Sequence, residues 1–154
     1  MELLVEVEAL YARYAEFLDE GPLAQWPSLF VEEGSYRAVT RENVDRGWPL
    51  ALMLCESRAS IEDRVYAIEN LALTIPRRVR HVVSGLMIRE EATGLVVSAN
   101  FVMFETLEGG STTCFSAGRY RDVLVRDSEG ALKFLDKTSI ADAALISNSL
   151  VIPL

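Results

Sequence analysis

The sequence predicts an α+β fold in which N-terminal helices pack on one curved, mostly antiparallel sheet. Two patterns carry this prediction. Apolar residues recur every three or four positions near the N-terminus, and four apolar, β-branched stretches fill residues 79–140. Short polar segments that contain glycine separate these stretches, and connections this short join antiparallel neighbours. The helices can bury their apolar stripes only against the sheet, so we expect a cone with helices across the concave face.

Length and charge limit the possible classes of protein. A chain of 154 residues is expected to form a single domain over residues 1–154. Its 15 basic and 23 acidic residues give a net charge of −8, which disfavours nucleic acid as a partner. No stretch approaches the roughly 18 apolar residues of a membrane helix. The acidic N-terminus does not resemble a secretory signal, so we expect a cytoplasmic protein.

The N-terminal half should contain three helices. The first spans about residues 3–18 and ends at Gly21 and Pro22, a pair that caps one helix and can begin the next. A shorter helix over 23–30 should place Trp26 and Phe30 on one face, as core anchors rather than ligand contacts. In the third helix, Ser60 and Asp63 have capping-box spacing. Its buried side should carry Ile61, Val65, Ile68 and Ala72.

Between the second and third helices we expect two short apolar stretches separated by an irregular polar segment. Residues 33–35 should form a turn, 36–40 a short strand, 41–49 an irregular polar segment and 50–54 another apolar strand.

The four bursts of the C-terminal half lie at 79–89, 95–106, 112–126 and 132–140. In the second burst, alternation predicts one wholly apolar face, which should contact the helices. Its members are Val97, Ala99, Phe101 and Met103. The opposite face still contains Val96, Val102 and Phe104, which suggests a partner. A sheet curled tightly enough to half-cover both of its sides is the alternative explanation.

The composition excludes several common metal sites from this chain. His81 is the only histidine, so neither a Rieske cluster with two His ligands nor a 2-His-1-carboxylate iron site can be built. Cys55 and Cys114 have neither zinc nor disulfide spacing, and we expect both to be buried thiols. Phosphate-loop, dinucleotide and nucleophile-elbow motifs are absent from the sequence. Acid/base chemistry inside the cone is the remaining type of reaction.

Five residues are candidates for such chemistry by side-chain type. They are Tyr14, Asp19, Tyr36, His81 and Asp136. For His81 a structural hydrogen bond is the favoured interpretation, and for Asp136 it is pairing with an arginine. Arg77, Arg78 and Arg80 could hold an anion, but pairing with acidic surface is more common for such a cluster.

Several stretches in this order resemble the small (β) subunit of Rieske-type aromatic-ring-hydroxylating oxygenases. This family shares the cone fold of nuclear transport factor 2, ketosteroid isomerase and scytalone dehydratase. The matching stretches are Q-W-P-S-L-F at 25–30, R-E-N-V-D-R-G-W-P-L at 41–50, E-S-x-x-S-x-x-D-R-V-Y-A-I at 56–68, R-H-V-V-S-G at 80–85, F-S-A-G-R-Y-R-D at 115–122 and the tail from 132 to the apolar residues 150–154. The R-E-N and D-R-V segments look most like the branch with salicylate 5-hydroxylase, anthranilate and terephthalate dioxygenases.

The resemblance implies a mainly structural subunit of an oxidoreductase that acts on an aromatic carboxylate. It implies a large subunit with a Rieske [2Fe-2S] cluster and mononuclear Fe(II), an α3β3 hexamer with β–β contacts, and no cofactor, metal ligand or catalytic residue on this chain. Subunit contacts are expected at Trp48, Arg77, Arg78, Arg80 and His81.

Two alternatives remain at this point. One is a free-standing SnoaL-like or ketosteroid-isomerase-like enzyme that uses the cone as a pocket. The other is a non-catalytic binding module that dimerises through its sheet.

Overall fold

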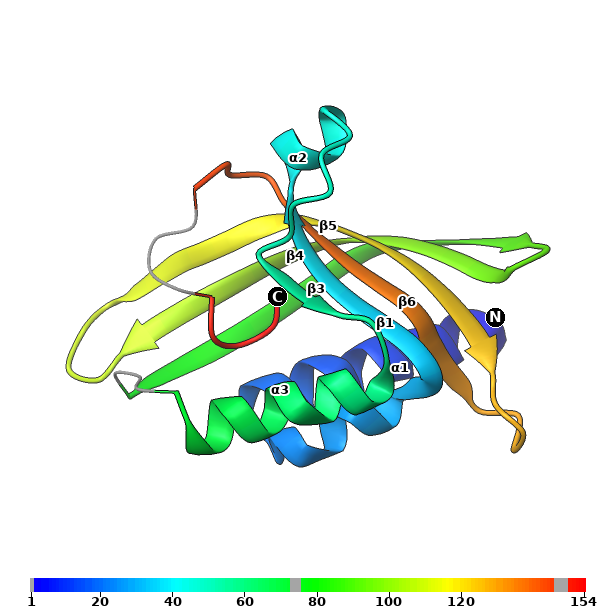
Figure 1. Cartoon of the computed structure of the whole chain (residues 1–154), viewed down its shortest axis with the longest axis horizontal. Coiled ribbons are helices and arrows are strands. Elements are labelled where there is room, and N and C mark those ends of the chain that lie inside the picture. Colours follow the sequence, from blue (N-terminus) through cyan, green and yellow to red (C-terminus); the bar gives the residue numbers. More distant parts are fainter. Residues whose placement is uncertain (1, 73–75, 146–149) are drawn as a thin grey trace.

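The structure is a computed structural model that describes residues 2–72, 76–145 and 150–154. Six strands form one sheet in the order β2-β1-β6-β5-β4-β3, and α1, η1 and α3 lie on one side of it (Figure 1). The elements are α1 (Glu2–Asp19), the 3-10 helix η1 (Leu23–Leu29), β1 (Phe30–Thr40), α2 (Arg41–Asp45), β2 (Met53–Cys55), α3 (Arg58–Asn70), β3 (Arg77–Glu91), β4 (Gly94–Leu107), β5 (Thr112–Arg126) and β6 (Leu132–Ala141).

The predicted α+β cone is confirmed. The strands β3, β4, β5 and β6 form an antiparallel meander whose boundaries lie within about two residues of the four apolar bursts. The pairing of β1 with β6 is parallel, because the chain crosses from the helices to the far side of the meander. The sheet is therefore mixed, with one parallel pair in an otherwise antiparallel order.

The core lies between α1 and the concave face of the sheet. The α1 side chains at three- and four-residue spacing are buried, including Val7, Leu10 and Leu18. The predicted inward face of β4 is also buried, with Val97, Ala99, Phe101 and Met103 each at most 2% exposed. The rings of Trp26 and Phe30 meet edge to face at 5.7 Å, which confirms their role as core anchors.

Four local predictions in the first half are wrong in whole or in part. Residues 33–35 do not form a turn but continue β1, where an irregular register opposite β6 takes up the extra residues. In the predicted irregular segment 41–49, residues 41–45 instead form the short helix α2, which the Thr40 side chain caps, whereas 46–49 belong to no helix or strand. The capping box of α3 consists of Ser57 and Ser60, not Ser60 and Asp63, so that helix begins at Arg58. It ends at Asn70, and Ala72 lies outside it.

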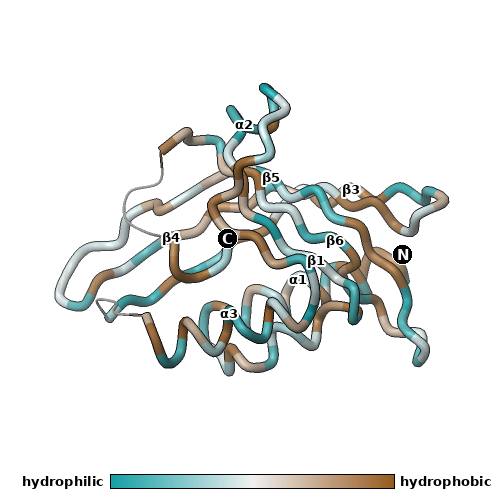
Figure 2. The backbone as a smooth tube through the Cα atoms, in the orientation of Figure 1, coloured by the Kyte–Doolittle hydropathy of each residue, from teal (hydrophilic) through white to brown (hydrophobic). Residues whose placement is uncertain are grey.

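A projection that we call the arm, residues 41–52, leaves the sheet at the end of β1. In Figure 1 it lies at the top, on the opposite side from α1 and α3. Its helix α2 is polar, and a hydrophobic stretch follows where the chain returns to the sheet (Figure 2). Trp48, Leu50 and Leu52 on this stretch are 47%, 62% and 42% exposed. The arm therefore presents apolar side chains to the solvent.

Among the helices of the described ranges, none is long and apolar enough to cross a membrane.

Candidate functional site

The interior of the cone contains a fully buried ion pair. Lys137 Nζ lies 3.2 Å from Asp122 Oδ2, and both side chains are inaccessible to solvent. Burial lowers the pKa of Lys137 to about 8, although the Asp122 carboxylate opposes the shift. Burial likewise raises the pKa of Asp122, against the opposing effects of Lys137 and Tyr11. The two charges depend on each other, since neither can reach water.

Aromatic rings enclose this pair. Lys137 Nζ lies 3.0 Å from the ring centroid of Tyr120 and 4.7 Å from that of Tyr14. Such cation–π contacts are strongest when the cation is desolvated. The Tyr11 hydroxyl donates a hydrogen bond to Asp122, and the Thr138 backbone N–H donates another at 3.0 Å. Both oxygens of the buried Asp122 carboxylate therefore have partners within the chain.

A register shift in the sheet explains why alternation along the sequence does not identify Lys137. Phe134 points inward, so simple alternation would put Asp136 inside and Lys137 outside. The pairing of β6 with β5 shifts by one residue after Phe134. From that point Asp136 faces outward and Lys137 faces the interior of the cone. Asp136 then lies on the outer face, where it pairs with Arg37 at 2.9 Å. The favoured interpretation of Asp136 as an arginine partner is confirmed.

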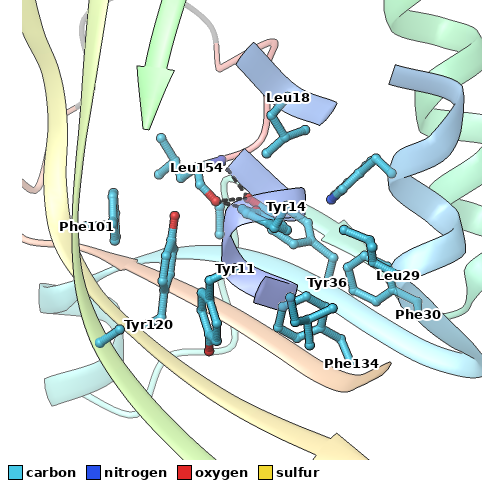
Figure 3. Close-up of a cluster of buried hydrophobic side chains, with 14 of the residues drawn as sticks. Tyr11, Tyr14, Leu18, Leu29, Phe30, Tyr36, Phe101, Tyr120, Phe134 and Leu154 are labelled. Carbon is cyan, nitrogen blue, oxygen red and sulfur yellow. Dashed lines mark hydrogen bonds between the residues drawn. The ribbon is translucent and has the colours of Figure 1, made fainter. Parts of the chain in front are cut away.

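The C-terminal segment 150–154 closes the cone, and we call it the tail. Leu154 is fully buried in the core, and Leu150 and Ile152 pack against it. The Leu154 carbonyl oxygen accepts hydrogen bonds from Tyr14 Oη at 2.5 Å and Ser139 Oγ at 2.9 Å. The Leu154 N–H donates to Tyr36 Oη at 2.8 Å (Figure 3). Two tyrosines that the sequence marks as acid/base candidates thus bind the protein's own main chain.

His81 anchors the tail from the other side. Its Nδ1 lies 2.5 Å from Asp19 Oδ1 and its Nε2 lies 2.9 Å from the Pro153 carbonyl oxygen. Both neighbours are acceptors, so the ring satisfies both bonds when each nitrogen carries a proton. The His81 backbone N–H donates to Asp19 Oδ2 at 2.9 Å. This confirms the favoured interpretation of His81 as a histidine with a structural hydrogen bond.

Burial raises the pKa of Tyr11, Tyr14, Tyr36 and Tyr120. Phenols shifted in this direction hold their protons more firmly and are poorer general bases at neutral pH. The described cavities include a groove of about 430 Å³ between α1 and β3. Its lining includes Tyr11, His81 and Leu86 but neither Tyr14 nor Tyr36, whose hydroxyls are hydrogen-bonded to Leu154.

Metal binding does not fit the described residues. Over 2–72, 76–145 and 150–154, no three His, Cys, Asp or Glu side chains come together in a group that could hold a metal ion. Cys55 is buried, but Cys114 is exposed near the end of the β4–β5 hairpin, so the expectation of a buried thiol at Cys114 is wrong. Cys114 of β5 pairs with Phe104 of β4, just beyond a register shift between these two strands. This end of the hairpin extends past the helices (Figure 1).

The outer surface shows the opposite distribution of residues. A hollow of about 760 Å³ lies between the arm and the outer face of β1 and β6, and its lining includes Trp48, Leu50, Leu54 and Ile140. The guanidinium carbon of Arg46 stacks 4.7 Å from the Trp48 ring centroid. The sequence-predicted contact residue Trp48 therefore lies, exposed, beside a hollow whose lining is both apolar and charged, since Arg37, Arg121 and Asp136 also border it.

The arginines of β3 lie at a different edge of the molecule, since β3 is the last strand of the sheet. Arg77 pairs with Glu105 at 2.6 Å and Arg80 with Glu20 at 2.9 Å. These pairs match the favoured interpretation of an arginine cluster balanced by acidic side chains. Arg78 is exposed. The structure separates this cluster from Trp48 and places His81 inside the subunit.

The fold and this interior define a class of protein: a nuclear transport factor 2-like cone whose polar interior is occupied by its own chain. Residues 13–148 match the family model described as the ring hydroxylating beta subunit. The chain belongs to this family of small subunits of aromatic-ring-hydroxylating dioxygenases.

Individual relatives agree with this assignment. The chain is 30% identical over 155 residues to the anthranilate 1,2-dioxygenase small subunit of Burkholderia cepacia, with 100% of this chain and 96% of the relative covered. It is 24% identical to a beta subunit of the terminal oxygenase component of terephthalate 1,2-dioxygenase from Comamonas sp., with 97% of each chain covered. A crystal structure from Novosphingobium aromaticivorans, assigned as the beta subunit of an aromatic-ring-hydroxylating dioxygenase, superposes with a TM-score of 0.85 at 33% identity, covering 97% and 95% of the two chains.

Sequence reasoning missed Tyr11, Asp122, Lys137 and the tail contacts of Ser139. Alternation from the buried Phe134 does not identify Lys137 as buried, because the register shift lies between the two residues. The F-S-A-G-R-Y-R-D stretch at 115–122 contains Asp122, and it was the one signal available for this carboxylate.

Proposed function

We propose that this chain is the mainly structural small subunit of an oxygenase that hydroxylates an aromatic carboxylate in the cytoplasm. In this proposal residues 1–154 form one domain, and the Rieske [2Fe-2S] cluster and the mononuclear Fe(II) belong to a separate large subunit. The family membership and the substrates in the relatives' names, anthranilate and terephthalate, support the choice of substrate class. One observation carries the structural role: the polar residues inside the cone bind each other and the tail.

The arm supports a contact with the large subunit. Trp48, Leu50 and Leu52 of the arm expose between 42% and 62% of their surface. Trp48 and Leu50 border one hollow together with Leu54 of the neighbouring strand β2. Clustered exposed apolar side chains on a soluble chain mark interaction surfaces, and tryptophan and arginine are frequent energetic centres of such contacts. The Arg46–Trp48 stack supplies both residue types at one point. We therefore assign the arm to the large subunit.

The charge distribution supports an assembly with threefold symmetry. The outer face of the sheet carries exposed arginines although the whole chain has a net charge of −8. Of these, Arg78, Arg119 and Arg121 have no acidic partner within the described part of the chain, whereas Arg37 and Arg80 are paired with Asp136 and Glu20. The solvent side of α1 carries Glu2, Glu8 and Glu16. A basic surface on one copy and an acidic surface elsewhere on the next make a head-to-tail contact, and such contacts close into rings. An α3β3 hexamer needs such a ring of three small subunits.

Coexpression with the large subunit tests the arm. The variant Trp48→Ala should weaken association by about 30-fold or more, because truncating a central anchor costs roughly 2 kcal/mol or more. Copurification and light scattering of the complex measure this change. Tyr66→Ala is the matched control, since Tyr66 on α3 is 61% exposed and lies away from the arm. Equal assembly of the two variants would remove the arm from the interface.

A second pair of variants tests the ring. Arg78→Glu with Arg119→Glu reverses two exposed charges of the basic face that lie outside the hollow beside the arm, whereas Arg58→Glu changes one charge on α3. The first change should shift the complex from a hexamer to smaller species in light scattering, with a strong dependence on salt. Hexamers that persist at low and high salt would contradict the head-to-tail arrangement.

The free-standing enzyme is the rival from another class, and one experiment separates it. The isolated chain should be colourless and inactive, whereas the coexpressed complex should carry the visible absorption of an iron–sulfur protein. Turnover of an aromatic acid, or of any isomerisation or dehydration substrate, by the isolated chain would overturn the proposed role.

A further inference from the structure

The last residue of the tail lies inside the cone at a site where hydrogen-bond donors surround one of its oxygen atoms. The hydroxyls of Tyr14 and Ser139 donate to the Leu154 carbonyl at 2.5 Å and 2.9 Å, and Tyr36 Oη lies 3.4 Å from the same oxygen. These hydroxyls come from α1, β1 and β6, so the fold and not one local segment assembles the site. Three hydroxyls around one oxygen form a site for a strong acceptor.

The tail fills this site without satisfying all of it. The Tyr120 hydroxyl is fully buried and has no hydrogen-bond partner within the described part of the chain. In Figure 3 it points to the same side of the cluster as Leu154, whereas the Tyr11 hydroxyl points the other way. A buried hydroxyl without a partner costs free energy that a better occupant can recover.

An occupant of this site needs an apolar body as well as an acceptor group. Leu154 supplies the apolar part now, since its side chain belongs to the same buried cluster as Phe101, Tyr120 and Tyr14 (Figure 3). His81 Nε2 adds a further polar contact, to the Pro153 carbonyl one residue away. Lys137 is already paired with Asp122, so the preference for a carboxylate over an ammonium ligand rests on the hydroxyl donors of Tyr14 and Ser139.

We propose that the cone of this small subunit binds a small aromatic carboxylic acid in the place of Leu154, with its carboxyl group on Tyr14, Tyr36 and Ser139. The tail is then a tethered competitor. Its attachment to the chain gives it an effective concentration in the millimolar range, so the full chain binds the acid only at comparable ligand concentrations. This site is independent of the iron centres and of the proposed hexamer, and its failure leaves the proposed function unchanged.

Full-length variants test the site with benzoate as the probe. Ile152→Ser with Leu154→Ser keeps the chain length but removes the apolar groups that hold the tail in the core. Benzoate should bind this double variant at least tenfold more tightly than it binds the wild type, measured by calorimetry. Val151→Ser is the matched control, because Val151 lies in the tail but is not among the residues packed on the core.

Two further comparisons identify the binding groups. Adding Ser139→Ala to the double variant should weaken benzoate binding by roughly three- to tenfold, the contribution of one hydrogen bond. Benzylamine, a cation of similar size, should not bind. A double variant with a native circular dichroism spectrum whose benzoate affinity equals that of the wild type would overturn the proposal.

A measurement on the wild type covers the case in which the double variant does not fold. Benzoate at tens of millimolar should speed hydrogen exchange in residues 150–154, relative to equal benzylamine, because the acid displaces the tail. Unchanged or slower exchange there would show that the tail does not give way, and the proposal would fall.

Discussion

The interior and the arm of this protein break the usual distribution of polar and apolar residues in opposite directions. Inside the cone, Asp122, Lys137 and four tyrosines are buried, and the carboxylate, the ammonium and most of the phenols are partnered within the chain. On the arm, Trp48 and the leucines that follow it are exposed. Buried polar groups must find partners at folding, whereas exposed apolar groups can find theirs later, in another subunit. Apart from the Tyr120 hydroxyl, the chain pairs these interior groups itself, whereas it leaves the apolar side chains of the arm exposed.

The largest expected effect concerns the buried ion pair. Lys137→Met leaves Asp122 as an uncompensated buried charge, and the free energy of unfolding should fall by about 3–5 kcal/mol in urea denaturation. The exposed pair of Arg46 and Glu42 is the control, and Arg46→Ala should cost no more than about 1 kcal/mol. Equal losses for the two variants would mean that the interior is wetter than the structure describes.

The pH dependence of stability sharpens the same contrast. The unfolded chain keeps Lys137 protonated up to its ordinary pKa of 10.5, whereas the folded chain loses that proton near pH 8. The unfolded state therefore binds more protons in this window, and stability rises with pH. Relative to the double variant Asp122→Asn with Lys137→Met, the wild type should gain up to about 1.4 kcal/mol per pH unit between pH 8 and 10. A flat difference over this range would contradict a buried ammonium.

A smaller effect is expected where the interior meets the tail. Asp19→Ala removes the acceptor of both the His81 ring and the His81 backbone N–H, which costs about 1–3 kcal/mol of unfolding free energy. Asp142→Ala is the comparison, because its pair with Arg41 is exposed and its loss should be within about 1 kcal/mol. Thermal denaturation of the two variants measures the difference.

The smallest effect is expected on the arm. Leu50 is 62% exposed, and Leu50→Ser should change the stability of the isolated chain by no more than about 0.5 kcal/mol. A loss above about 2 kcal/mol would show that the arm packs within its own subunit, and the comparison between the two regions would no longer hold.

Much of the fold was predictable because its elements carry periodic signals. The four meander strands alternate or run apolar between glycine turns, and α1 repeats its apolar residues at helical spacing. The turn expected at 33–35 failed because Gly34 lies inside β1, where a Cβ atom would come within 2.8 Å of the Phe134 carbonyl oxygen. Glycine there permits close strand approach rather than a turn. The structural role of His81 was predictable because a chain with one histidine cannot form the common metal sites that need two.

The sequence by itself determined the class: helices before a meander predict the cone, and one histidine cannot supply the two histidines of a Rieske cluster or of a 2-His-1-carboxylate iron site. Only the tertiary structure decided what fills the cone. A register shift in β6 turns Lys137 inward, and residues 150–154 return to cover hydroxyls on three separate elements. Contacts between residues more than a hundred positions apart, such as those of Tyr14 and Tyr36 with Leu154, leave no local pattern in the chain. They form only when the sheet has brought its strands into register.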